Sequence, residues 1–144
     1  MIRARRFQPG PIHLLRLEQG SDIVDAITAY ATTEGIQAAW FTYLGAVSRA
    51  ALRYYDQIAN EYRDFAVDLH LEVLSGVGNV SLRDGVPFVH THAALGDASG
   101  RALGGHLNQG CIVFSLEVRL QELLGDPPVR LPDSATGLSL WGLD

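Results

Sequence analysis

Hydrophobic and polar positions along this chain predict one helix among several strands. Apolar residues recur at three- and four-residue intervals between Ile23 and Ala31, which is the spacing of one face of an amphipathic helix. Ser21 before this run is a candidate N-cap, and Gly35 after it is a stop signal. The pattern therefore predicts a helix over about residues 22–33.

The part of the chain after the helix has the composition of strands. Residues 36–44 and 46–55 are two apolar runs separated by Gly45, and they could pair as a hairpin. Residues 65–74 alternate cleanly between apolar and polar positions, which predicts one half-buried strand with Phe65 and Leu69 facing inward. Further strands are predicted over four segments: 11–18, 80–82, 88–95 and 112–120.

The last twenty residues predict a loop-like tail. The pair Pro127-Pro128 excludes a continuing helix or a central strand, although Leu138, Leu140 and Trp141 could return to cover an apolar face. One main flanking helix and about seven strands place the chain in the α+β class, with a mostly antiparallel sheet.

Length and composition indicate a single ordered domain. The chain has 144 residues, of which 47% are hydrophobic and 19% charged, so we expect one domain over residues 1–144. The single Cys111 excludes an intrachain disulfide and a cysteine-based zinc site, and we interpret it as an ordinary buried thiol.

The charge balance argues against a protein that binds nucleic acid directly. There are 11 basic and 16 acidic residues, which gives a net charge of −5, and the only basic cluster is Arg3, Arg5 and Arg6.

No apolar run reaches the length of a membrane span, and the first residues lack the apolar region of a signal peptide. We therefore expect a cytoplasmic protein without membrane contact.

Three of the five histidines lie close together in the sequence, at positions 90, 92 and 106. Because residues i and i+2 of a strand share a face, His90 and His92 can present two imidazoles to one point. With His106 they would form a donor set for a divalent metal, and zinc is the usual choice for neutral nitrogen ligands. Two such histidines can also be ordinary polar residues on a solvated or partly buried face. We expect His13 and His70 to be ordinary surface histidines or histidines whose hydrogen bonds are satisfied within the fold.

The register of a simple hairpin does not bring the three histidines together. If residues 88–95 and 101–107 paired about an Ala98-Ser99 turn, His106 would lie opposite Thr91 and face the other side of the sheet. A bulge at Gly104-Gly105 would shift the parity by one residue and correct this. The sequence therefore predicts a bulge wherever the histidines form a site.

Two outward-facing carboxylates are candidates for acid or base chemistry. Glu72 or Glu117 could move protons for a water bound to the metal, in a zinc-dependent hydrolase or lyase. Carboxylates on the outer face of a strand are also commonly just solvated. We leave both interpretations open, with the enzyme as the weaker alternative.

The residues around the histidines resemble the PPC domain, the plants-and-prokaryotes conserved domain. The motifs that carry the resemblance are His-Thr-His at 90–92, Gly-Gly-His at 104–106, and Leu-Glu-Val-Leu-Ser at 71–75, which is similar to the family's Phe-Glu-Ile-Leu-Ser. The resemblance extends over about residues 5–141. The family's Arg before this last motif is His70 here, so the partner contacts of that Arg are not expected to carry over.

The resemblance implies a homotrimer and a metal. In prokaryotic members the motif histidines, which match His90, His92 and His106, are associated with a bound metal that is commonly zinc. Apolar outer faces, such as that of residues 112–120, are then expected between subunits. The implied role is a small-ligand-binding or regulatory one that the resemblance leaves undefined.

The plant relatives suggest an alternative function, that of a DNA-binding or transcription-associated regulator. In those proteins the domain follows an AT-hook, and residues 3–6 here, Arg-Ala-Arg-Arg, lack the Gly and Pro of that element. A DNA-binding trimer would instead need a basic face built from five arginines: Arg3, Arg5, Arg6, Arg49 and Arg53.

Overall fold

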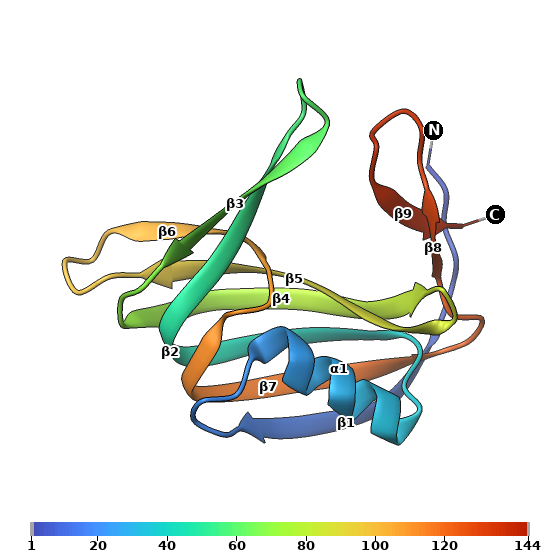
Figure 1. Ribbon diagram of the computed structural model, residues 1–144. Helices are drawn as coiled ribbons and strands as arrows, with labels where there is room; N and C mark the ends of the chain where they lie inside the picture. Colours follow the sequence, from blue (N-terminus) through green and yellow to red (C-terminus); the bar gives the residue numbers. More distant parts are fainter. Residues whose placement is uncertain (1, 144) are drawn as a thin grey trace.

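The computed structural model describes residues 2–143, and Met1 and Asp144, at the ends of the predicted domain, lie outside the described residues. Figure 1 shows a long twisted sheet with one helix against one of its faces. The elements are β1 (Gln8–Leu17), α1 (Ile23–Glu34), β2 (Ala39–Asp56), β3 (Glu61–Val67), β4 (Leu71–Arg83), β5 (Val86–Gly96), β6 (Ala102–Leu107), β7 (Ile112–Leu124), β8 (Val129–Pro132) and β9 (Ser139–Gly142).

The sheet has the strand order β1-β7-β2-β6-β5-β4-β8-β9, with β3 paired to β2 and a further pairing between β2 and β4. The α+β class with one main helix is confirmed. The predicted count of about seven strands needs correction, because residues 2–143 form nine, and one pairing in the otherwise antiparallel sheet, that of β4 with β8, is parallel. The sheet is therefore mixed.

Helix α1 covers one face of the sheet and supplies part of the core. Its buried residues Ile23, Ile27 and Ala31 belong to the same apolar cluster as the sheet residues beneath them. The N-cap is Asp22, whose side chain accepts a hydrogen bond from the Asp25 backbone N–H, and not Ser21 as predicted. The predicted stop is confirmed, since Gly35 adopts the left-handed conformation that ends many helices.

The two apolar runs around Gly45 form one continuous strand instead of the predicted hairpin. Strand β2 passes through Gly45 with only a register shift against β4. A Cβ atom at this position would lie 2.1 Å from the backbone oxygen of Ser115 in β7, so glycine is needed for the close approach of two strands and not for a turn. In the sequence, a glycine between two apolar runs looks the same whether it marks a turn or a close approach of two strands.

Two further predictions about strands need correction. The alternating run 65–74 is divided between β3 and β4, so Phe65 and Leu69 are exposed instead of buried. The tail is not a loop, because it folds back as the β8–β9 hairpin, with Arg130 opposite Trp141.

No helix within residues 2–143 is long and apolar enough to cross a membrane.

Candidate metal centre

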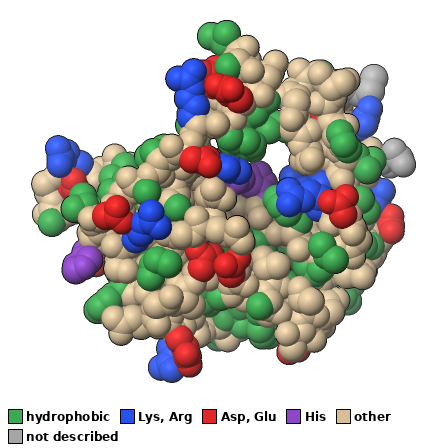
Figure 2. Space-filling view, viewed as in Figure 1, with side chains coloured by type: hydrophobic (Ala, Val, Ile, Leu, Met, Phe, Trp, Pro, Cys, Tyr) green, Lys and Arg blue, Asp and Glu red, His purple; other side chains and the backbone are tan. Residues whose placement is uncertain are grey.

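Two hairpins rise from the sheet, and the three histidines lie between them. One is the β2–β3 hairpin and the other is the β8–β9 hairpin (Figure 1). Figure 2 shows the histidines at the bottom of the hollow between these two projections, with basic side chains on either side. His90 and His92 come from β5 and His106 comes from β6.

The register of the β5–β6 hairpin places His106 directly opposite His92, on the same face as His90. The predicted bulge at Gly104-Gly105 is absent, because the pairing runs without a shift from Gly96↔Ala102 to His92↔His106. Instead, the length of the loop between β5 and β6 places His106 on the same face of the sheet as His90 and His92. Asp97 Oδ1 accepts hydrogen bonds from the backbone N–H groups of Ser99 and Arg101, which sets a connection one residue longer than the expected turn.

The glycines before His106 have a different function from the predicted one. A Cβ atom at Gly104 would lie 2.1 Å from the backbone oxygen of Ala93, so only glycine lets β6 pack this closely against β5. Gly105 has φ +154°, which lies within the range that L side chains rarely adopt. The Gly-Gly pair therefore permits the hairpin that carries the imidazoles.

The three imidazole rings form a nearly equilateral group. The ring centroids are 4.9 Å apart for His90 and His106, and 5.1 Å apart for each of the other two pairs. One ligand nitrogen from each ring lies within 4.8 Å of the others, and the Nε2 atoms of His90 and His92 are 3.2 Å apart. Zinc–nitrogen bonds of about 2.05 Å at tetrahedral angles place two ligand atoms about 3.3 Å apart. The His90–His92 separation matches this value, and the three histidines together could hold a metal.

The surroundings keep these histidines in the form that binds cations. Burial lowers the pKa of His90 to about 4, helped by the positive charge of Arg130. Burial also lowers the pKa of His106 to about 4, with a smaller contribution from His92 and then from Arg53. The pKa of His92 is lowered by partial burial alone. At neutral pH the rings are therefore uncharged, with nitrogen lone pairs available to a metal.

Side chains from distant parts of the sequence surround the histidines. Arg130 donates to Nδ1 of His90 (3.2 Å), Oγ of Ser81 (2.9 Å), Oδ1 of Asn79 (3.1 Å) and the backbone oxygen of Ser139 (3.0 Å). On the other side, the ring of Tyr62 packs against His106, with 5.6 Å between centroids. Sequence reasoning missed both contacts, because neither residue shares a motif with the histidines.

The opposite face of β5 is anchored in the core. Thr91, between the two strand histidines, is buried, and its hydroxyl donates to the backbone oxygen of Val77 at 2.9 Å. The hydroxyl of the buried Tyr43 lies 2.9 Å from the same Thr91 oxygen. The ring of Tyr43 in turn lies over Gly76, where a Cβ atom would come within 2.2 Å of it. Strand β5, which carries His90 and His92, is therefore fixed to the core on the face opposite the two histidines.

Neither carboxylate considered for catalysis is part of the histidine group. Among the described residues, the potential metal ligands that lie together are the three histidines alone. Glu72 pairs with Gly96 at the other end of the β4–β5 ladder, and Glu117 pairs with Leu44 on β2. The nearby acidic side chain is Asp64, which acts on the pKa of His106 but is bound to Arg53.

The arginines proposed for a basic DNA-binding face are largely neutralised. Arg5 forms an ion pair with Asp126, Arg49 with Asp68 at 2.7 Å, and Arg53 with Asp64 at 2.9 Å. Three of the five positive charges that such a face needs therefore have acidic partners within the chain.

The fold and the site together define an α+β domain whose sheet presents three convergent histidines, a group that could hold a metal. Residues 4–124 match the model of the Plants and Prokaryotes Conserved (PCC) domain, and the chain belongs to this family. The resemblance stated from the sequence motifs is thereby confirmed.

Two solved archaeal structures are closely similar to this chain. A metal-containing protein from Archaeoglobus fulgidus is 41% identical and superposes with a TM-score of 0.93 over 97% of this chain and 99% of that one. A plant- and prokaryote-conserved (PPC) protein from Pyrococcus horikoshii is 35% identical, with a TM-score of 0.91 over 97% of this chain and 96% of that one.

The chain is also similar to part of a longer protein. It is 36% identical over 141 residues to the bifunctional protein GlmU of a Synechococcus strain, which covers 93% of this chain. The chain spans about a fifth of the length of the curated relatives that it matches, 21% in each case.

Proposed function

We propose that this domain binds a divalent cation, zinc in the first instance, through His90, His92 and His106, in a small-ligand-binding or regulatory role. The observation that carries the proposal is the convergence of three uncharged imidazoles, each with a ligand nitrogen within 4.8 Å of the others, and with the pair His90–His92 at 3.2 Å, a separation that suits tetrahedral zinc. The similarity to a metal-containing archaeal protein over almost the whole of both chains supports it.

Residues of this chain would both hold the cation and keep the imidazole rings in place. His90, His92 and His106 would hold the cation, while Arg130 and Tyr62 restrict the rings of His90 and His106. Zinc held by three protein nitrogens supplies a Lewis acid with one position open to a further ligand.

Metal content measured by plasma mass spectrometry on the untagged protein tests this proposal. We expect about one zinc per chain in the wild type and its loss in His92→Ala, because two imidazoles do not complete the donor set. His70→Ala, at an exposed histidine outside the group, is the matched control and should keep the metal. A wild type that stays metal-free after incubation with zinc, chromatography and analysis at neutral pH would refute the proposal.

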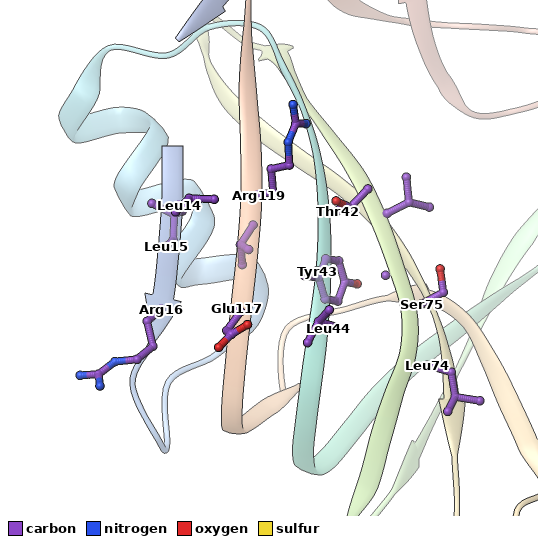
Figure 3. Close-up of a pocket in the computed structure, with 13 residues that line it drawn as sticks. Leu14, Leu15, Arg16, Thr42, Tyr43, Leu44, Leu74, Ser75, Glu117 and Arg119 are labelled. Atoms are coloured by element: carbon purple, nitrogen blue, oxygen red, sulfur yellow. The ribbon is translucent and has the colours of Figure 1, made fainter. Parts of the chain in front are cut away.

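We further propose that the domain assembles as a homotrimer through the sheet face that α1 leaves uncovered. A groove of about 870 Å³ crosses this face over β1, β7, β2 and β4, and Figure 3 shows the side chains that line it. Leu14 is 81% exposed there, and Leu44 and Leu74 are each 59% exposed. Apolar side chains exposed together are typical of protein interfaces, and second and third copies of this chain are the occupants that we propose.

The polar residues of the same groove suit contact between identical chains. Arg16, Glu117 and Arg119 lie among the leucines, so the face carries charges of both signs (Figure 3). Outside the groove, a bulge in β7 turns Phe114 outward, where it is 58% exposed. The predicted contribution of residues 112–120 to an interface would then come from Phe114 and the charged positions.

A further inference from the structure

A second cavity lies beside the histidines, between the two projecting hairpins. It has a volume of about 240 Å³, and the β2–β3 hairpin, the β8–β9 hairpin, and residues of β4, β5 and β6 contribute to its walls. His90 and His106 belong to its lining, so the cavity opens directly onto the candidate metal centre. None of its lining residues is acidic, although three are arginines: Arg53, Arg83 and Arg130.

Two of these arginines lie over one aromatic ring. The guanidinium carbon of Arg83 is 4.0 Å from the ring centroid of Phe88, and that of Arg130 is 5.1 Å from the same centroid. The positive charge of Arg83 acts on Arg130 strongly enough to lower its pKa, after the larger effect of burial. Two like charges therefore lie against the same ring, and each is within reach of the other's electric field.

Neither of these two charges has an acidic partner among residues 2–143. Arg130 is half-buried, and all of its hydrogen bonds are to neutral acceptors. The side chain of Arg83 makes no hydrogen bond or ion pair with the described part of the chain, although its backbone pairs with Val86 in the β4–β5 ladder. Arg53 differs, because both oxygens of Asp64 accept hydrogen bonds from it. The cavity therefore carries two uncompensated positive charges.

An anion is the ligand that such an arrangement fits. Like charges held together in a partly buried cavity are costly, and an oxyanion between them replaces repulsion with two attractions. Guanidinium groups match the geometry of carboxylate and phosphate oxygens, and hydrogen bonds between charged partners are the strong ones. Phe88, Leu138 and Leu140 add an apolar wall for the uncharged part of a ligand.

We propose that this cavity binds a small organic anion, whose carboxylate or phosphate group lies against Arg83 and Arg130 and whose apolar part contacts Phe88 and Leu140. This inference deepens the proposed function and rests on it for the role of the ligand, which would be bound beside the cation. The arginines and the apolar wall come from the chain itself, so binding of the anion can be measured with and without metal.

Three small probes separate charge from shape. Benzoate and phenyl phosphate carry the two candidate anionic groups on the same ring, and benzamide is an uncharged counterpart of benzoate. We expect the NMR signals of cavity residues to shift saturably with benzoate or phenyl phosphate and not with benzamide. The tighter of the two anions identifies the group that the arginines prefer. Absence of saturable binding for both anions would overturn the proposal.

The variant Arg83→Gln tests the assignment within the protein. Arg83 is exposed at the end of β4, so the substitution removes charge without opening the core. We expect about a tenfold or greater loss of affinity for the bound anion, which is the effect of losing a hydrogen bond to a charged group. Arg63→Gln is the matched control, because Arg63 is exposed, pairs with Asp56 and does not line the cavity. Equal weakening in both variants, or in neither, would refute the site.

Zinc content measured on the same samples distinguishes this proposal from that of the metal centre. The titrations are made on zinc-incubated protein and on protein treated with EDTA. Anion binding that depends on Arg83 in the EDTA-treated sample supports the cavity even where no zinc is retained. Zinc binding without any anion binding leaves the metal centre in place and refutes the cavity.

Discussion

The low pKa values of the half-buried His90 and His106 make the metal-free protein sensitive to acid in a defined range. His90 and His106 have pKa values of about 4 in the folded chain, whereas an imidazole in an unfolded chain titrates near 6.5. Between these values the unfolded state binds more protons, so the free energy of unfolding falls as the pH is lowered. This contribution is fully present above about pH 6.5 and is lost as the pH falls through 4.

We therefore expect the unfolding midpoint of the EDTA-treated protein to drop by several degrees between pH 7 and pH 4.5. Thermal unfolding followed by circular dichroism at several pH values measures this. The slope should be smaller in His106→Asn and unchanged in His70→Asn, since His70 is exposed. The carboxylates with lowered pKa values act at lower pH, with Asp97 at about 2, and do not produce this slope. An equal slope in wild type and His106→Asn would contradict the interpretation.

At the scale of elements, the β5–β6 hairpin determines whether the histidines meet. Gly104 lets the two strands approach, and a Cβ atom there would lie 2.1 Å from the backbone oxygen of Ala93. We expect Gly104→Ala to reduce the free energy of unfolding by about 2 kcal/mol, the typical cost of forcing extra atoms into a packed position. The zinc content should fall with it, because the strand of His106 must move.

Urea unfolding and metal analysis together test this expectation. The control is Ala102→Ser in the same strand, at an exposed position where a substitution changes stability by about 0.5 kcal/mol or less. Wild-type stability and zinc content in Gly104→Ala would show that the close approach of the strands is not required.

The elements also show which parts of the fold the sequence can predict. The helix and its stop at Gly35 follow from local spacing, and the placement of His90 and His92 on one face follows from strand geometry. The continuity of β2 through Gly45 could not be predicted, because its cause is a strand about seventy residues away. The register of β5 and β6 depends on hydrogen bonds of Asp97 within the loop, which spacing alone does not reveal.

The cavity beside the histidines is the part of the site that was hardest to foresee. Arg130 is 40 residues from His90 in the sequence, in a tail that the proline pair predicts to be a loop. It reaches the site because β8 pairs with β4 and β9 folds back on β8. Such contacts between distant segments are absent from any local pattern.

At the scale of the whole molecule, the uncovered sheet face leads to a prediction about assembly. We expect light scattering to give three times the 15.6 kDa chain mass for the wild type and a mass near one chain for Leu44→Asp. An aspartate at this position would lose its water in the interface and would lie directly opposite the like-charged Glu117 of β7. Figure 3 shows Leu44 on the strand at the middle of the groove.

Ile58→Asp is the matched control for this experiment. Ile58 is 97% exposed at the turn of the β2–β3 hairpin, outside the groove, so its substitution should leave the mass unchanged. The zinc content of Leu44→Asp should equal that of the wild type if the three histidines of one chain form a complete site. A monomeric wild type, or a Leu44→Asp protein with the wild-type mass, would refute the proposed interface.

The attachment of β5 to the core, on the face opposite the histidines, affects the thermodynamics of metal binding. Strand β5 is paired with β4 along its length and with β6 from His92 onward, and it is tied to the core through Thr91, so its backbone is already fixed before any cation arrives. A cation bound here would restrict little beyond the torsions of three rings, and the entropy loss that accompanies binding would be small. The free energy of cation binding would then be nearly equal to the free energy of its contacts with the histidines, because no part of the chain has to fold on binding. Removal of the metal should therefore leave a folded domain, unlike the small zinc domains that unfold without their ion.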